Sequence, residues 1–155
     1  MVRIIKPPHP INLTSDTPSI FLAGSIEMGT ATNWQAEFEQ AFQAEAVVLL
    51  NPRRDDWNAA WVQQIDNEPF REQVEWELQA QERADVIAMY FQPETKAPIT
   101  LLELGLFARS SKLIVCCPAG FWRKGNVDVV CQRYGVPQLA RLADLIAAVK
   151  VRVKR

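Results

Sequence analysis

The chain has little of the chemistry that metal proteins and disulfide-rich proteins need. Among its 155 residues there is one histidine, His9, which stands between prolines near the start, and there are three cysteines. Cys116 and Cys117 are adjacent in an apolar run and Cys131 stands apart, which is neither a disulfide framework nor a metal-ligand spacing. We therefore expect reduced thiols, no metal and no other cofactor.

The chain also lacks an excess of one charge and a long apolar run. Seventeen basic and eighteen acidic residues leave a net charge of −1, so no general electrostatic field favours nucleic acid or an anionic membrane. No apolar run approaches the roughly 20 residues that span a bilayer, and no secretion signal is recognisable at the start. These observations predict a cytoplasmic protein that binds neither nucleic acid nor membranes.

What the chain does contain is enough apolar sequence for one complete core. It is 48% hydrophobic and 23% charged, which is typical of a folded globular protein. Residues 1–18 are rich in proline and are expected to form an extended arm. Residues 19–155 are expected to form a single domain.

Short apolar runs alternate with segments of helical period along this domain. Such continuous apolar runs suit a parallel sheet that is buried on both faces. The alternation predicts an α/β fold, a doubly wound open parallel sheet of five strands flanked by helices, similar to flavodoxin and Rossmann folds. The expected strands are 19–24, 46–50, 85–91, 112–117 and 136–139, and the expected helices are 33–42, 69–83, 98–110, 123–134 and 140–152.

Ligands of such sheets bind outside the carboxyl ends of the strands, so the loops that follow Gly24, Leu50 and Phe91 are of interest. The first of these loops has glycines at 24 and 29, without the spacing of a dinucleotide site or a P-loop. Gly24 would let a ligand approach the backbone closely, and Ser25 could donate a hydrogen bond to it. A tight turn into a helix explains the same residues equally well.

Glu103 is the sharper candidate, because it lies among leucines in the sequence LLELG near the start of an expected helix. A carboxylate in that position is either a site residue or a structural residue, since the first turn of a helix favours negative charge. The residues alone leave both interpretations open.

Other polar and aromatic residues are weaker candidates when each is taken alone. Glu77 lies on the helix before the third strand, where acidic residues are usually solvent-facing. Asn126 precedes a helical segment and suits a helix cap. Trp57, Trp61 and Trp122 could stack on a planar base or close over the core.

Taken together, five segments resemble the nucleoside 2-deoxyribosyltransferase family, in particular its divergent branch of small single-domain members. The specificity lies in their order and spacing. The segments are SIFLAGSI at 19–26, VVLLNPRRDDW at 47–57, QVEWELQAQERADVIAMYF at 73–91, ITLLELG at 99–105 and FWRKGNVDVVCQRYGVP at 121–137.

The resemblance implies roles for three of the candidates. Glu103 matches the glutamate that acts as the nucleophile in this family. Glu77 matches an acid of the related 2-deoxynucleoside 5-phosphate hydrolases. Asn126 matches an asparagine that reaches the sugar 5-hydroxyl in a neighbouring subunit, which implies a homo-oligomer with a shared site.

Two departures from the family pattern concern the substrate. The hydrolases hold a 5-phosphate with an arginine where this chain has Glu27, so free nucleosides are favoured over monophosphates. The transferases have an aspartate shortly before the nucleophile, and the nearest acid here is Glu94. Glu94 is therefore a candidate for binding the base.

The resulting prediction is an enzyme that cleaves the N-glycosidic bond of (deoxy)ribonucleosides. Glu103 would attack the sugar while Glu77 protonates or positions the departing base, and the sugar would pass to a second free nucleobase or to water. A non-catalytic nucleoside-binding module or sensor is the alternative, and a purely structural role is a third.

Overall fold

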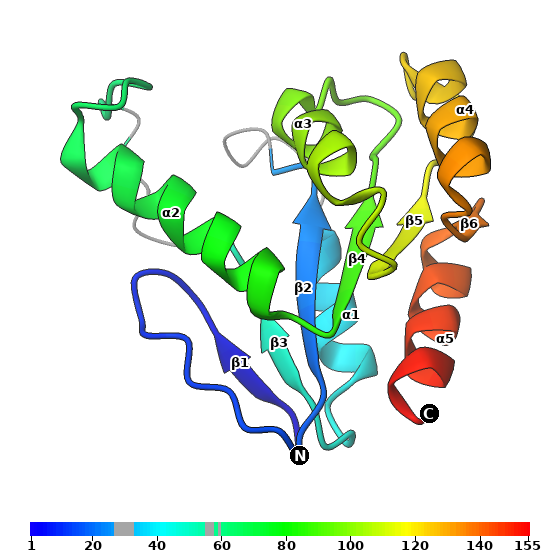
Figure 1. The fold of residues 1–155 in the computed structure, drawn as a ribbon, viewed down its shortest axis with the longest axis horizontal. Helices are drawn as coiled ribbons and strands as arrows, with labels where there is room; N and C mark the ends of the chain where they lie inside the picture. Colours follow the sequence, from blue (N-terminus) through cyan, green and yellow to red (C-terminus); the bar gives the residue numbers. More distant parts are fainter. Residues whose placement is uncertain (27–32, 55–57, 59) are drawn as a thin grey trace.

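The computed structural model describes residues 1–26, 33–54, 58 and 60–155, in which strands and helices alternate (Figure 1). The elements in chain order are β1 (Arg3–Ile5), β2 (Ser19–Gly24), α1 (Trp34–Ala41), β3 (Val48–Leu50), α2 (Glu68–Arg83), β4 (Val86–Tyr90), α3 (Pro98–Phe107), β5 (Leu113–Cys116), α4 (Lys124–Tyr134), β6 (Gln138–Leu139) and α5 (Leu142–Val153).

The strands form one parallel sheet in the order β1-β3-β2-β4-β5-β6. The α/β class and the open parallel sheet are thus confirmed, but the sheet has six strands and not five. The additional strand is β1, which lies in the segment expected to be an extended arm and pairs with β3. With only three residues and a buried Ile5, β1 is too short to show an apolar period in the sequence.

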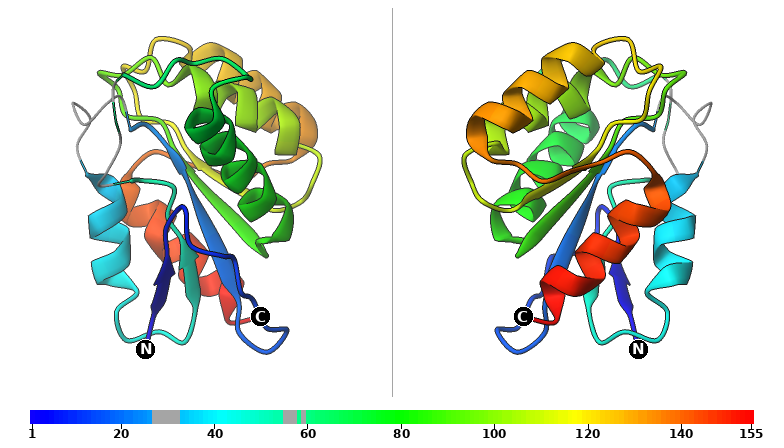
Figure 2. Two further views of the ribbon diagram at one scale, coloured as in Figure 1. Left: turned by 90° about the vertical axis from the view of Figure 1, so that its left-hand side faces the viewer. Right: turned by 90° about the vertical axis from the view of Figure 1, so that its right-hand side faces the viewer.

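Helices cover both faces of the sheet, with α2, α3 and α4 on one face and α1 and α5 on the other (Figure 2). Each face has its own apolar cluster. Along β2, Phe21 and Ala23 point into the first cluster, and Ile20 and Leu22 point into the second. Because both faces are covered, every residue of the central strands can be apolar, which accounts for the continuous runs in the sequence.

Asparagine side chains cap the N-termini of two helices. Asn33 accepts a hydrogen bond from the backbone N–H of Ala36 at the start of α1, and Asn67 caps α2 in the same way. The expectation that Asn126 caps a helix is wrong. Helix α4 begins at Lys124 after an Arg123 cap, so Asn126 is its third residue.

Within the described ranges there is no helix with the length and apolar character needed to cross a membrane. Cys116, Cys117 and Cys131 are all buried with free thiols.

Candidate active site

The strand order reverses around β2, because β3 lies on one side of it and β4 on the other. Such a reversal separates the loops that follow neighbouring strands and opens a crevice between them. Two of the three loops of interest, those after β2 and β4, meet here through buried hydrogen bonds.

Ser25 joins these two loops. Its hydroxyl donates to Thr95 Oγ1 over 2.7 Å, because the Thr95 hydroxyl itself donates to the carbonyl of Gln92 over 2.9 Å. The backbone N–H of Gln92 in turn donates to Ser25 Oγ at 3.2 Å. Ser25 is only 1% exposed, so its hydroxyl positions the loop after β4, and its contact with a substrate remains a prediction.

Gly24 is required by the packing beneath that loop. A Cβ atom at this position would lie 2.5 Å from Trp34 Cζ2 and 2.5 Å from the carbonyl oxygen of Tyr90. The indole of Trp34 is fully buried and donates to the carbonyl of Ser25 over 3.2 Å. Glycine at 24 therefore lets the ring lie against the end of β2, and a role of Gly24 in substrate binding remains a prediction.

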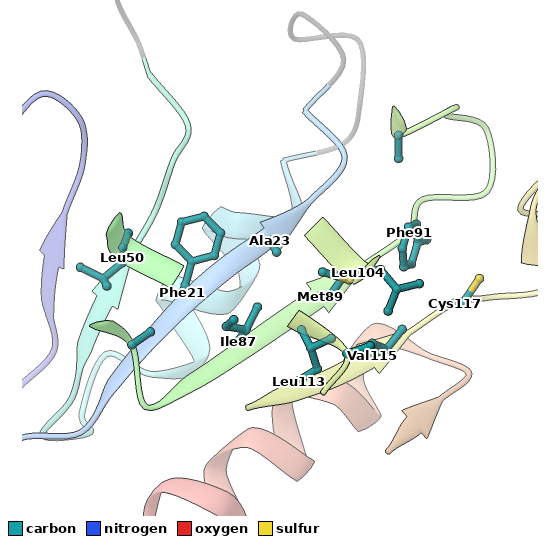
Figure 3. Close-up of a cluster of buried hydrophobic side chains, with 14 of the residues drawn as sticks. Phe21, Ala23, Leu50, Ile87, Met89, Phe91, Leu104, Leu113, Val115 and Cys117 are labelled. Carbon is teal, nitrogen blue, oxygen red and sulfur yellow. The ribbon is translucent and has the colours of Figure 1, made fainter. Parts of the chain in front are cut away.

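Glu103 is a buried carboxyl group and not a helix cap. The N-cap of α3 is Ala97, whereas Glu103 is in the second turn and only 7% exposed. Its neighbour Leu104 packs into the core beside Met89 and Val115 (Figure 3). Leu104, with the partly buried Leu101, thus anchors α3 to the core, while the Glu103 carboxyl group contacts Gln81 of α2.

The side chain of Glu103 meets a row of polar residues on α2. Gln73, Glu77 and Gln81 are spaced four apart, which places them on one face of the helix. The Gln81 amide donates to Glu103 Oε2 over 2.5 Å and to the backbone carbonyl of Glu77 over 3.1 Å. The Gln73 amide donates to Glu77 Oε1 over 3.3 Å. The structure therefore brings together the two glutamates that were predicted to carry the chemistry.

Burial raises the pKa of both of these carboxyl groups above the ordinary value of a glutamate. The pKa of Glu103 is raised to about 8, first by burial and then by the negative charge of Glu77, while the Gln81 hydrogen bond opposes the rise. Burial likewise raises the pKa of Glu77 to about 7 against the opposing hydrogen bond from Gln73. Because the groups interact, they titrate as a pair, and the pair retains a proton near neutral pH.

The loop after β3 contributes to the same neighbourhood through its backbone. The carbonyl of Pro52 accepts a hydrogen bond from the Gln73 amide over 3.1 Å. The preceding Asn51 is buried, donates to Glu39 Oε1 over 2.7 Å and accepts from the backbone N–H of Arg53 over 3.0 Å. This turn therefore fixes the start of the loop against α1 and α2.

Two other sequence candidates lie on the surface. Glu94 is exposed in the loop between β4 and α3, and Asn126 is exposed on α4. Their roles in substrate binding remain predictions. Glu27, on which the preference for free nucleosides depends, is outside the described residues.

Two of the tryptophan candidates, Trp61 and Trp122, have a cationic side chain near a ring. Trp122 is 47% exposed, and the Lys96 ammonium lies 4.3 Å from the centre of one of its rings. The guanidinium of Arg54 lies 4.9 Å from a ring centre of Trp61. Trp57 is outside the described residues. Base stacking on any of the three remains a prediction.

Gln81 and Thr95 are residues of this site that sequence analysis missed. Glutamine on a helix and threonine in a loop carry no motif of their own. The one available signal was the spacing of Gln73, Glu77 and Gln81, which places two amides one turn before and after a candidate acid.

The fold and the site define an α/β protein in which a buried glutamate of α3, Glu103, lies near a partly buried glutamate of α2, Glu77, on one face of a parallel sheet. Residues 17–121 match the family described as nucleoside 2-deoxyribosyltransferase like, and because this match spans more than half of the chain, the protein belongs to that family. Both Glu77 and Glu103 lie within the matched residues, whereas Asn126 lies beyond them. A comparison with curated proteins gives no match.

Proposed function

We propose that the protein cleaves the N-glycosidic bond of nucleosides through a covalent glycosyl-glutamate at Glu103. The observation that carries this proposal is the buried Glu103 carboxyl group, whose pKa is raised by burial and by the neighbouring Glu77, in a member of this family. Cleavage of such a bond passes through an oxocarbenium-like state, and two adjacent carboxyl groups supply the nucleophile and the acid that it needs.

In the first step, a Glu103 oxygen forms a bond to the anomeric carbon of the sugar. The bond between this carbon and the base breaks, and its electron pair goes to the base nitrogen. Glu77 either protonates this nitrogen or holds the departing base in place. Positive charge that develops on the sugar favours ionised Glu103, so the proton of the pair moves to Glu77 as the substrate reacts.

In the second step, the glycosyl ester is broken by an acceptor. A nitrogen of a second nucleobase, or a water oxygen, attacks the anomeric carbon and gives its proton to the Glu77 carboxylate, and Glu103 leaves as a carboxylate. Two inversions at this carbon give overall retention. The burial of Glu103 limits the access of water, which favours transfer to a base over hydrolysis.

The substrates that we propose are free nucleosides together with a free nucleobase. Glu27 follows Ser25 by two residues, so a negative charge is present in the sequence where a 5-phosphate would need a positive one. The protein is expected to work in the cytoplasm without a metal or other cofactor. Within the described residues no cluster of three or more histidine, cysteine or acidic side chains could hold a metal ion.

The proposal is tested by incubating the protein with a deoxynucleoside and a different free base. We expect a new nucleoside to form, or the first base to be released, with retention of configuration at the anomeric carbon. Chromatography measures the products, and NMR measures the configuration. If no common pair of nucleoside and base gives either product, the enzymatic proposal fails. Thermal stabilisation by a nucleoside without any product would instead identify a non-catalytic binding module.

We further propose that the active protein is a homo-oligomer in which Asn126 completes the site of a neighbouring copy. Asn126 is exposed on α4, and the adjacent α3 carries exposed apolar side chains at a helical spacing. These are Ile99, Leu102 and Leu106, which are 58%, 60% and 55% exposed. A contiguous exposed apolar stripe is a frequent mark of a protein–protein interface.

Mixing two inactive variants tests the shared site. Glu103→Gln and Asn126→Ala should each be inactive alone, but hybrids prepared by co-expression should regain about a quarter of the wild-type activity in a dimer, since half the dimers then have one intact site. The control pairs Glu103→Gln with Glu77→Gln. Those two residues meet within one chain, so the control hybrid has no intact site. Equal activity in both mixtures would contradict the role of Asn126.

A further inference from the structure

We propose that Gln81 is a positioning residue for the nucleophile: its buried amide holds the Glu103 carboxyl group at a fixed place relative to Glu77. This inference rests on the proposed function, in which Glu103 attacks and Glu77 assists. The Gln81 side chain is fully buried between α2 and α3.

Both hydrogens of the Gln81 amide are in use. One is donated to Glu103 Oε2 over 2.5 Å and the other to the backbone carbonyl of Glu77 over 3.1 Å. The first contact is made to a carboxyl oxygen, and such a hydrogen bond is stronger when the carboxyl group is ionised. The amide therefore connects the side chain of one glutamate to the main chain of the other.

The orientation of the amide is determined by these partners. If its oxygen and nitrogen were exchanged, the oxygen would face the backbone carbonyl of Glu77, which can only accept a hydrogen bond. In the orientation present, Gln81 Oε1 is buried without a hydrogen-bond partner among the described residues. An unpartnered buried oxygen costs free energy that an apolar side chain of similar size would avoid. The amide is thus unfavourable for the core and useful to the carboxyl pair.

The distance between two acid groups determines what they can do at a glycosidic bond. A free glutamate side chain has three rotatable bonds, and its carboxyl group could turn away from the sugar carbon. Gln81 removes that freedom at Glu103, and because it is anchored one helical turn after Glu77, the separation of the two groups follows from the geometry of α2. Its donated hydrogen also favours the charged form of Glu103, which is the form that attacks.

The test replaces Gln81 with methionine, which has a similar length and no amide. NMR titration of the Glu103 carboxyl carbon in glutamate-labelled protein should show its pKa about one unit above the wild-type value. In turnover, the acid limb of the kcat/KM profile should move to higher pH by the same amount. At pH 7 we expect kcat to fall tenfold or more with little change in KM, and part of this loss to be recovered at higher pH.

Gln73→Met is the matched control. Gln73 is also buried on the same face of α2, donates to Glu77 and has an Oε1 without a partner among the described residues, but it does not donate to Glu103. This variant should shift the titration of Glu103 much less than Gln81→Met does, because Gln73 acts on Glu103 only through the charge of Glu77. If Gln81→Met does not fold, Gln81→Asn keeps the amide and shortens the side chain, so that the donor no longer reaches Glu103.

A Glu103 titration that is the same in Gln81→Met, or Gln81→Asn, as in the wild type overturns the proposal. So does a loss of kcat that is equal at every pH, because that is the signature of general structural damage. The titration needs no substrate, so it distinguishes this inference from the proposed function. A shifted titration in a protein without turnover would support the contact and reject the enzyme.

Discussion

Replacing Glu103 with glutamine should lower kcat/KM for base exchange by more than about a thousandfold. An amide cannot form the glycosyl ester on which both steps depend, and loss of a nucleophile usually removes most of the rate enhancement. The fold should be retained, because a glutamine at 103 has the same shape and still offers an oxygen to the Gln81 amide. Chromatographic assay of the new nucleoside measures the loss, and thermal unfolding checks the fold.

Glu75→Gln is the matched control for this variant, because it makes the same chemical change at an exposed position of α2. Its activity should stay within about twofold of the wild type, as is usual for a surface substitution. Mass spectrometry of quenched reactions adds a direct readout. The wild type and Glu75→Gln should carry a glycosyl adduct on Glu103, and Glu103→Gln should carry none. Residual exchange in Glu103→Gln near the wild-type rate would exclude Glu103 as the nucleophile.

Most of the fold could be predicted from local sequence because each element has a clear period or terminator. The run SIFLAG ends at Gly24 and became β2 with the expected bounds. The spacing of Trp34, Phe38 and Phe42 indicated α1, and all three are fully buried. Strand β1 could not be found in this way, since its three residues become a strand only by pairing with β3, which is distant in sequence.

The site was only partly predictable for a related reason. Glu103 was an open choice between a capping residue and a site residue, since its burial depends on α2 packing over α3. Gln81, the residue that contacts it, is 22 positions away in the chain and carries no motif. The prediction that Asn126 caps α4 was wrong, because the helix already begins at Lys124. A residue type that suits an N-cap acts as one only where its own backbone is non-helical.

The free energy of unfolding should fall as the pH rises through neutrality, because Glu77 and Glu103 then ionise in the folded protein. Both have folded pKa values, about 7 and about 8, above the ordinary value of 4.5. Between pH 4.5 and these folded pKa values, the folded state binds more protons than the unfolded state, so the free energy of unfolding decreases as the pH rises. Their stabilising contribution is complete below about pH 4.5 and is lost as the pH passes the folded values.

A Glu77→Gln/Glu103→Gln double variant removes this dependence. Each pKa unit corresponds to about 1.4 kcal/mol, so the melting temperature of the double variant should exceed that of the wild type by on the order of 10 °C at pH 8.5. The two should melt at nearly the same temperature at pH 4, where the wild-type glutamates are neutral. Calorimetry across this pH range measures the difference in melting temperature. A difference that is the same at every pH would show that ionisation of the two glutamates does not destabilise the folded protein. Under the proposed function, this loss of stability accompanies the placement of an ionisable Glu103 beside Glu77, where the sugar would be attacked.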